Sequence, residues 1–119
     1  MKPSDFDFVV FHMPNGKFPR EAAKRLGFNE KQTETGLIVP HIGNPYSASS
    51  LLGLSFVLDK ARTDQRIFLV SYGSGAGSDA FIIEISSLLA KRRRLAPVGS
   101  FYLRHKENID YSTYLRMQI

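Results

Sequence analysis

The segment 46–61 carries no charged side chain before Asp59 and reads Tyr-Ser-Ala-Ser-Ser-Leu-Leu-Gly-Leu-Ser-Phe-Val-Leu-Asp-Lys-Ala. It predicts a helix with apolar or small residues on every side, and a helix of that kind is buried. A chain of 119 residues offers little protein to cover such a helix all round. We therefore expect a partner surface to cover part of it. Its small residues would let another backbone approach closely; they are Ser47, Ser49, Ser50, Gly53 and Ser55.

Three further segments predict strands. Residues 6–12 are rich in β-branched and aromatic side chains and precede a Pro-Asn-Gly turn, which places His12 at the carboxyl end of a buried strand. Residues 66–72 form a nearly continuous apolar strand. Residues 80–86 follow after the glycine-rich loop 73–79, close enough for these two strands to pair in antiparallel fashion.

The segments between the first two strands predict two further helical pieces and a short strand. Apolar residues recur four apart over 18–26, and Gly27 follows, which is typical of a short amphipathic helix with a glycine stop. Residues 29–32 resemble a capping box and predict another helical turn. Residues 37–42 predict a brief extended piece, although Pro40 argues against a central position in a sheet.

The resulting order, β-α-(short β)-α-β-β, describes an α/β domain with a mixed β-sheet and one buried central helix. An apolar share of 43% is that of a globular protein. Neither an internal repeat nor a linker interrupts the chain, so residues 1–119 are expected to form a single domain.

The net positive charge suggests nucleic-acid binding, but the distribution of the cations argues against it. The chain has 16 Lys and Arg against 11 Asp and Glu, a net charge of +5. Four of the cations form one run, Lys91-Arg92-Arg93-Arg94, and a short basic run of this kind is more often a solvated surface turn than a phosphate-binding patch. No nucleic-acid partner is therefore expected, although an anionic small ligand could use the run.

The composition excludes other classes of function. No stretch approaches the roughly 18 apolar residues of a membrane span, so no membrane role is expected. The first residues mix charge and proline and lack the apolar core of a secretory signal, so we expect a cytoplasmic protein. The absence of cysteine excludes disulfides, thiolate metal sites and a cysteine nucleophile within these residues, and no metal site is expected.

Three loops lie at the ends of predicted elements, where functional residues gather. They hold His12, the pair Gly43-Asn44 before the buried helix, and Ser74 in the glycine-rich loop. Each also has a structural interpretation, as a core histidine, a helix cap and a hairpin loop. The glycine-rich loop matches neither a dinucleotide fingerprint nor a P-loop, because no lysine follows it and it precedes a strand.

Taken together, these loops carry a family resemblance. They read Phe-His-Met-Pro-Asn-Gly-Lys-Phe-Pro at 11–19, Gly-Asn-Pro-Tyr-Ser-Ala-Ser-Ser at 43–50 and Ser-Tyr-Gly-Ser-Gly-Ala-Gly-Ser-Asp-Ala-Phe at 71–81. A closing segment, 108–116, reads Asn-Ile-Asp-Tyr-Ser-Thr-Tyr-Leu-Arg. In order and spacing the motifs resemble the carboxyl-terminal half of archaeal-type hydroxymethylglutaryl-CoA synthase, of the thiolase-like superfamily, over nearly the whole chain.

The resemblance implies a thiolase-like half domain, in which two similar halves pack together and each contributes a buried helix, here 46–61, to the middle layer. His12 resembles the histidine that donates to the acyl carbonyl or passes a proton during condensation. Asn44 resembles the asparagine that binds the substrate, and Ser74 the serine that contacts the acyl group. Lys17 resembles the lysine that meets coenzyme A, and an ammonium group suits the phosphates of that molecule.

The resemblance also implies that Arg20 helps to bind an acidic acyl group. Glu21 departs from the family pattern, where a second arginine is expected after Arg20, and a carboxylate there would weaken that binding. The implied substrate is a coenzyme A thioester, with no covalently bound cofactor, and the implied process is isoprenoid precursor biosynthesis through the mevalonate pathway.

The missing nucleophile leaves two hypotheses. In the family a cysteine of the amino-terminal half holds an acetyl group as a thioester, and without a thiolate this covalent step has no carrier, so the chain is not expected to be an active acyltransferase alone. Either it is the carboxyl-terminal portion of a condensing enzyme and adds its histidine, asparagine and serine to a cysteine-bearing partner, or it is a non-catalytic remnant or acyl-CoA-binding module. In the second case a homodimer would cover the helix through a two-fold contact.

Overall fold

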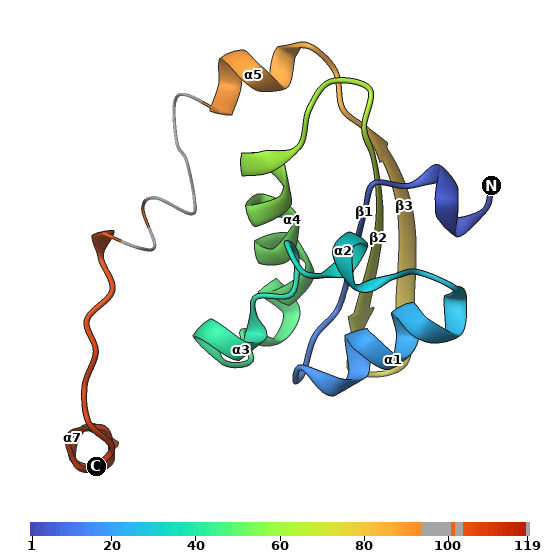
Figure 1. The fold of residues 1–119 in the computed structure, drawn as a ribbon. Coiled ribbons are helices and arrows are strands. Elements are labelled where there is room, and N and C mark those ends of the chain that lie inside the picture. Colours follow the sequence, from blue (N-terminus) through green and yellow to red (C-terminus); the bar gives the residue numbers. More distant parts are fainter. Residues whose placement is uncertain (94–100, 102–103, 119) are drawn as a thin grey trace.

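A three-stranded sheet in the order β1-β2-β3 organises the protein, and the computed structural model describes residues 1–93, 101 and 104–118 (Figure 1). In chain order the elements are η1 (Pro3–Asp5), β1 (Phe8–Phe11), α1 (Lys17–Leu26), α2 (Glu30–Thr33), α3 (Val39–Ile42), η2 (Tyr46–Ala48), α4 (Ser49–Lys60), β2 (Arg66–Gly73), β3 (Gly77–Glu84), α5 (Leu88–Arg93) and α7 (Tyr111–Met117). β1 pairs with β2 in parallel, and β2 and β3 form an antiparallel hairpin. The predicted mixed sheet is confirmed.

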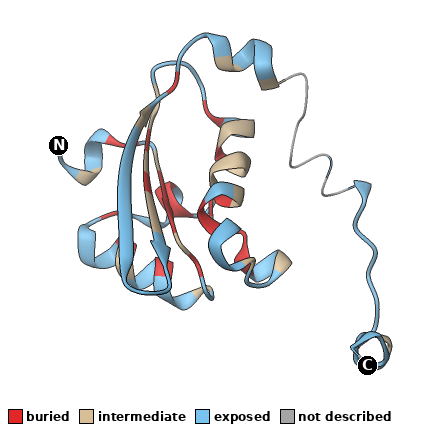
Figure 2. Cartoon of the chain, turned by 180° about the vertical axis from the view of Figure 1, so that it is seen from behind, coloured by how far each residue is buried: buried red, intermediate tan, exposed pale blue. Residues whose placement is uncertain are grey.

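The strands bury side chains on both faces of the sheet, because successive residues of a strand point to opposite sides. Val10 and Ile67 belong to one buried cluster, which includes Val57 of α4. Val9 and Phe11 belong to a second cluster on the opposite face, which includes residues of α1 and the phenylalanines Phe6, Phe28 and Phe68. Figure 2 shows most buried residues lying between the sheet and these helices. The sheet therefore lies between α4 on one side and α1 on the other.

The predicted uncharged helix is confirmed, as η2 followed by α4. Three of its small residues, Ser49, Ser50 and Gly53, are buried on the side that packs against the sheet, whereas Ser47 is exposed and Ser55 is half-buried. A Cβ added at Gly53 would lie 2.6 Å from the carbonyl oxygen of Gly36, so the backbones approach as closely as glycine allows. The opposite side is uncovered, and Leu51 is 62% exposed.

Local caps fix the two short helices between β1 and α3. The Asn15 side chain accepts hydrogen bonds from the backbone N–H groups of Lys17 and Phe18, which starts α1. Gly27 ends α1 in the left-handed conformation, with φ of 85°, as predicted. Asn29 and Gln32 bond reciprocally at the start of α2, which confirms the predicted capping box.

The predicted short strand at 37–42 is wrong, because Val39–Ile42 forms the helix α3. Pro40 lies in the first turn of this helix, where its fixed φ suits a helix and its missing N–H is not needed. The N–H of Gly43 donates to the carbonyl of Val39 and closes the turn. The observed order therefore has three short helices between β1 and η2.

The basic run belongs largely to α5, for which no helix was predicted. The side chain of Arg93 donates to the carbonyl oxygens of Leu58 and Ala61, at the carboxyl end of α4. These carbonyls have no partner within their helix, and a cation there complements the helix dipole. Lys91 and Arg92 are exposed, and Arg94 lies outside the described residues.

The helix α7 stands apart from the sheet and its helices in Figure 1. Asp110 caps it by accepting a hydrogen bond from the N–H of Thr113 at 2.7 Å. That bond, together with one from the Ser112 hydroxyl, holds the pKa of Asp110 below its ordinary value. Among the described residues, no helix is both long enough and apolar enough to span a bilayer.

Candidate functional site

A groove of about 500 Å³ runs between α1 and the carboxyl ends of β1 and β2. Apolar side chains make up most of its wall, and the polar groups are His12, Tyr72 and Ser78. Its full lining is Phe11, His12, Pro14, Phe18, Pro19, Ala22, Val70, Tyr72 and Ser78. Parallel strands bring their carboxyl ends to one edge of the sheet, which explains why β1 and β2 meet here. A mostly apolar hollow with few polar groups is typical of a small-molecule site.

Three contacts hold His12 at the edge of this groove. Its backbone N–H donates to the carbonyl of Val70 at 2.9 Å, which continues the pairing of β1 with β2. Its ring nitrogen Nδ1 lies 2.9 Å from the Ser49 hydroxyl oxygen at the start of α4. The hydroxyl oxygen also accepts the backbone N–H of Met13, the next residue, at 3.2 Å. The ring of Tyr72 lies 5.8 Å from the imidazole, centroid to centroid, so the histidine is held from the sheet and from α4.

A second hollow adjoins the groove along the outer side of α1. Its walls include Lys17 and Arg25, together with Glu21. It shares Phe18 and Ala22 with the groove, so the two hollows lie side by side along the helix. The predicted coenzyme A contact Lys17 therefore lies beside the groove that holds His12, and Arg25 adds a second cation.

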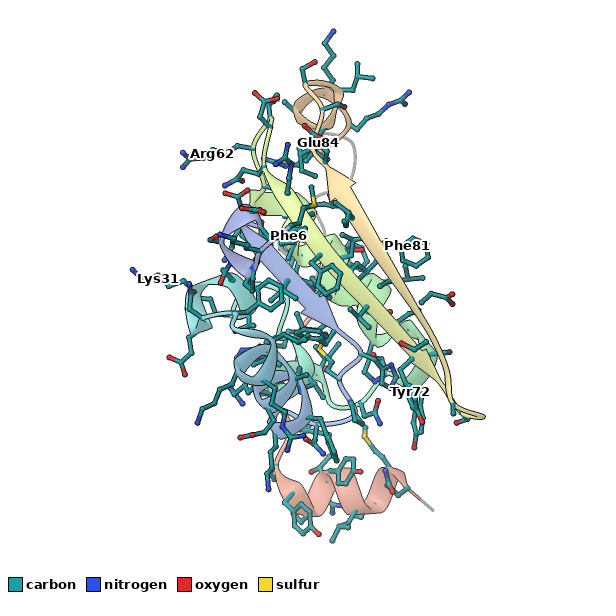
Figure 3. All side chains as sticks on the ribbon, turned by 90° about the vertical axis from the view of Figure 1, so that its right-hand side faces the viewer. Phe6, Lys31, Arg62, Tyr72, Phe81 and Glu84 are labelled. Carbon is teal, nitrogen blue, oxygen red and sulfur yellow. The ribbon has the colours of Figure 1, made fainter. Side chains whose placement is uncertain are left out.

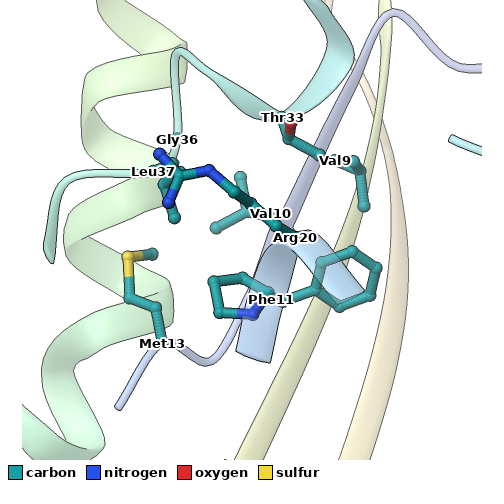
Figure 4. A pocket seen from close by; sticks show the side chains of 9 residues that line it. Val9, Val10, Phe11, Met13, Arg20, Thr33, Gly36 and Leu37 are labelled. Carbon is teal, nitrogen blue, oxygen red and sulfur yellow. The ribbon is translucent and has the colours of Figure 1, made fainter. Parts of the chain in front are cut away.

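Arg20 points to the opposite side of α1. Its guanidinium donates to the carbonyl of Gly16 at 2.8 Å and borders a cavity of about 10 Å³ against Val10, Met13 and Gly36 (Figure 4). A cavity of this size holds about one water molecule. Arg20 is therefore not among the residues that line the groove, and its predicted role in binding an acyl group stays a prediction.

Asn44 lies in the turn that leads into η2. Its side-chain oxygen accepts a hydrogen bond from the backbone N–H of Tyr46 at 2.8 Å. Among the described residues the amide nitrogen of Asn44 has no partner, so it is available to a ligand. Tyr46 has a positive φ of 54°, a conformation that non-glycine residues adopt at a cost of about 1 kcal/mol or more. η2 packs against β2, so this turn lies near the carboxyl edge of the sheet.

Ser74 lies at the tip of the β2–β3 hairpin and is exposed. The pairing of Gly73 with Gly77 leaves three residues in the turn, and Ala76 and Gly75 both have positive φ. The interpretation of this segment as a hairpin loop is confirmed. Ser74 does not line the groove, and its contact with an acyl group stays a prediction, as does the role of Asn44.

Sequence reasoning missed three residues of this site. From the sequence, Ser49 was predicted only to be a small residue of the buried helix. Tyr72 and Ser78 were predicted only to lie in a strand and in a loop. Tyr72 pairs directly with Ser78 across the hairpin. Figure 3 labels Tyr72 at the carboxyl end of β2. The alternation of side chains along β2 is the one signal that predicts which strand residues share a face.

The donors at the groove are neutral or cationic. Among residues 1–93, 101 and 104–118, no three His, Cys, Asp or Glu side chains gather in a way that could hold a metal ion. An imidazole and a phenol in an apolar setting can donate hydrogen bonds to a carbonyl oxygen that gains negative charge, whereas the Ser78 hydroxyl already donates to the carbonyl of Ser71 at 2.9 Å. The arrangement is thus suited to stabilise an oxyanion, and it offers no nucleophilic thiol, because the chain has no cysteine.

Comparison with known proteins places this geometry in a family. Residues 1–85 match the family described as 3-oxoacyl-[acyl-carrier-protein (ACP)] synthase III C terminal. The chain is 51% identical over 117 residues to the hydroxymethylglutaryl-CoA synthase of Methanocaldococcus jannaschii, covering 98% of this chain and 34% of that protein. It is 52% identical over 118 residues to the same enzyme of Picrophilus torridus, again with 98% and 34% covered. The chain thus spans about a third of the length of the curated relatives it matches.

Solved structures share the fold. MvaS in complex with 3-hydroxy-3-methylglutaryl coenzyme A superposes with a TM-score of 0.81 at 24% identity, over 98% of this chain and 35% of that chain. The HMG synthase of the curacin pathway, in complex with an acetyl donor ACP, superposes with a TM-score of 0.75 at 22% identity, over 96% and 32%. The predicted resemblance is confirmed: the chain belongs to the family of 3-oxoacyl-ACP synthase III carboxyl-terminal regions, has the thiolase-like fold, and corresponds to the carboxyl-terminal part of hydroxymethylglutaryl-CoA synthases.

Proposed function

We propose that this chain supplies the carboxyl-terminal part of an acyl-CoA condensing site of the hydroxymethylglutaryl-CoA synthase kind. The cysteine that carries the acetyl group would come from a region outside these 119 residues. His12 is the principal hydrogen-bond donor of the proposed site, and Asn44 and Ser74 are proposed to contact the substrate. The observation that carries the proposal is the placement of His12 at the rim of an apolar groove, beside a second hollow that Lys17 lines.

The chemistry of condensation supports a fixed hydrogen-bond donor at this position. Forming a carbon–carbon bond at a thioester places negative charge on a carbonyl oxygen, and fixed donors in an apolar setting stabilise that charge. His12 is fixed by the sheet on one side and by Ser49 on the other. It therefore needs little reorganisation to meet the developing charge.

The shape of the two hollows supports a coenzyme A thioester as the ligand. Such a molecule has a long, narrow arm of short alkyl segments joined by amides that ends in the reactive thioester, and phosphates at its far end. The groove presents apolar walls around His12, and the adjoining hollow presents the cations Lys17 and Arg25. Homologous synthases have been solved in complex with CoA and with 3-hydroxy-3-methylglutaryl coenzyme A.

The decisive experiment mixes this chain with the amino-terminal region of the Methanocaldococcus jannaschii synthase that precedes the matched part. Release of free coenzyme A thiol from acetyl-CoA is followed with and without acetoacetyl-CoA. The proposal predicts thiol release that depends on acetoacetyl-CoA and on both polypeptides. Substituting His12→Ala should lower its rate by at least about 100-fold, because a positioned proton donor commonly contributes that much.

Two controls sharpen this assay. His105→Ala removes an imidazole that does not line the groove, and it should leave the rate unchanged. The chain without its complement should release no thiol above background. A mixture that stays inactive although the two polypeptides co-elute on size exclusion would refute the catalytic role.

The uncovered side of α4 favours a second candidate, a self-associating module without catalysis. Leu51 is 62% exposed on a helix that carries no charge before Asp59, and a second copy could cover it through a two-fold contact. Sedimentation equilibrium decides this point. A stable monomer at micromolar concentration would remove the second candidate and leave the first intact.

A further inference from the structure

Among residues 1–93, 101 and 104–118, Ser49 is the one side chain that forms a hydrogen bond with the imidazole of His12. It is the first residue of α4, and none of its surface is exposed. Its hydroxyl oxygen lies 2.9 Å from Nδ1 of His12 and 3.2 Å from the backbone nitrogen of Met13. The two partners come from the segment that follows β1, and the serine comes from a helix 36 residues further along the chain.

The direction of these two hydrogen bonds follows from the protons available. The backbone N–H of Met13 can only donate, so the Ser49 oxygen accepts from it. The hydroxyl has one proton of its own to donate, and its other partner is Nδ1 of His12. If Nδ1 also carried a proton, both partners would donate to the oxygen, and the buried hydroxyl proton would have no acceptor among these contacts.

From this proton count we infer that Ser49 is a positioning residue: it donates to Nδ1 of His12 and thereby fixes the neutral ring with its proton on Nε2. The inference rests on the proposed function of His12. Nε2 lies across the ring from Nδ1, and among the described residues it has no hydrogen-bond partner, so it is available to a ligand in the groove that His12 lines. Ser49 therefore turns an imidazole that could either donate or accept into one that donates toward a bound acyl oxygen.

The packing of α4 gives this hydrogen bond its rigidity. Gly53 lies one turn beyond Ser49 and allows α4 to approach the backbone at Gly36. Ser49 and Gly53 face the same side of the helix, because residues four apart lie above one another. The hydroxyl thus lies one turn from a close contact of α4 with the backbone at Gly36, and the ring of Tyr72 lies 5.8 Å from the imidazole on the side of β2.

Nitrogen NMR of the full chain tests the inference without any catalytic assay. The chain is labelled with ¹⁵N in its three histidines, and spectra are recorded at about pH 9, where imidazoles are neutral. The signals of His12 are assigned by their loss in His12→Gln. The expected spectrum shows a protonated Nε2 and an unprotonated Nδ1 for this residue. A protonated Nδ1 in the unsubstituted chain would overturn the inference, and this outcome needs no serine variant to fold.

The serine variants provide the second measurement. In Ser49→Ala the two His12 nitrogen signals should shift toward each other, because both neutral tautomers become populated. Ser50→Ala removes a hydroxyl from the adjacent buried position and should leave the signals unchanged. Unchanged His12 signals in a folded Ser49→Ala chain would also overturn the inference. Failure of the complementation assay alone would refute the proposed function. The spectra would still decide separately whether Ser49 fixes the tautomer of His12.

Discussion

At the scale of single residues, Gly53 sets how closely α4 can approach the sheet. An added Cβ would lie 2.6 Å from the Gly36 carbonyl oxygen, 2.8 Å from Val10 Cγ1 and 2.9 Å from Met13 Cε. Alanine favours a helix over glycine by about 1 kcal/mol, but overpacking a buried contact of this kind costs about 1–3 kcal/mol. We expect Gly53→Ala to lower the free energy of unfolding by about 1 kcal/mol net, measured by urea denaturation.

Gly73→Ala is the matched control for this substitution. A Cβ at Gly73 would meet no atom within 4 Å, so the unfolding free energy should change by less than about 0.5 kcal/mol. If both variants unfold at the same urea concentration, the close contact of α4 does not limit its packing.

Residue-scale contacts were only partly predictable from the sequence. The small residues of 46–61 predicted a close approach of backbones, and Gly53 confirms it. Neither the partner of Gly53 nor the bond between Ser49 and His12 was predictable, because each joins segments that only the tertiary path of the chain brings together. Hydrophobic periodicity reports which face of an element is buried and carries no information about which polar atoms meet there.

At the scale of elements, α5 stabilises the end of α4 through one arginine. The guanidinium of Arg93 donates to the carbonyls of Leu58 and Ala61, which α4 leaves without helical partners. Removing hydrogen bonds from a charged donor typically costs about 1.5–3 kcal/mol, and partial exposure of Arg93 reduces this value to about 1 kcal/mol. Arg93→Ala should lower the thermal unfolding midpoint measurably, and Arg92→Ala, at an exposed position of the same run, should not.

The cap of α7 makes a prediction about pH. The N–H of Thr113 and the Ser112 hydroxyl bond the ionised Asp110 carboxylate and lower its pKa. A lowered pKa means that the cap stabilises α7 above the ordinary carboxyl pKa of about 4, and that this stability is lost as the pH falls through the lower value in the folded state. The ¹³Cα shifts of residues 111–117 should therefore lose helical character on acidification below about pH 4.

Asp110→Asn isolates the charge from the cap. Asparagine caps a helix about as well as aspartate but does not titrate in this range. The shifts of α7 in this variant should not change over the same acid range. A helix that melts equally in both chains would show that the carboxylate does not hold α7 in place.

The elements themselves were largely predictable where their pattern is strong. The strands, the helix ending at Gly27 and the uncharged helix follow from periodicity and stop signals. The segment 37–42 was predicted wrongly because an apolar run this short suits either conformation, and the position of Pro40 within it decides for helix. The helix α5 was missed because a Leu-Leu pair followed by a basic run has no clear period.

At the scale of the whole molecule, the uncovered apolar surface lies on α4 and on β3. The residues of β3 are largely exposed, including Phe81 at 52%. Phe81 pairs with Leu69, whose side chain belongs to the cluster under α4, so Phe81 points to the α4 side of the sheet. Exposed apolar residues on one side of a small domain mark an interaction surface. The partner predicted for the uncharged helix therefore has a face to bind, and the two candidate partners are a second copy of this chain and the cysteine-bearing region.

Leu51→Glu tests that face, because a carboxylate at its exposed position would have to be buried without a partner when the surface is covered. We expect the variant to unfold at the temperature of the unsubstituted chain, since Leu51 contributes little to its core. In sedimentation velocity at micromolar concentration, we expect it to lose association with whichever partner covers the face, a second copy or the amino-terminal region of the synthase. Lys60→Glu places the same charge at the already charged end of α4 and should still associate.

If Leu51→Glu abolishes binding to the amino-terminal region of the synthase and does not change the mass of the chain alone, the face belongs to the condensing site. If it abolishes only self-association, the face serves a dimer. Association that survives in both assays would show that α4 is not part of the interface.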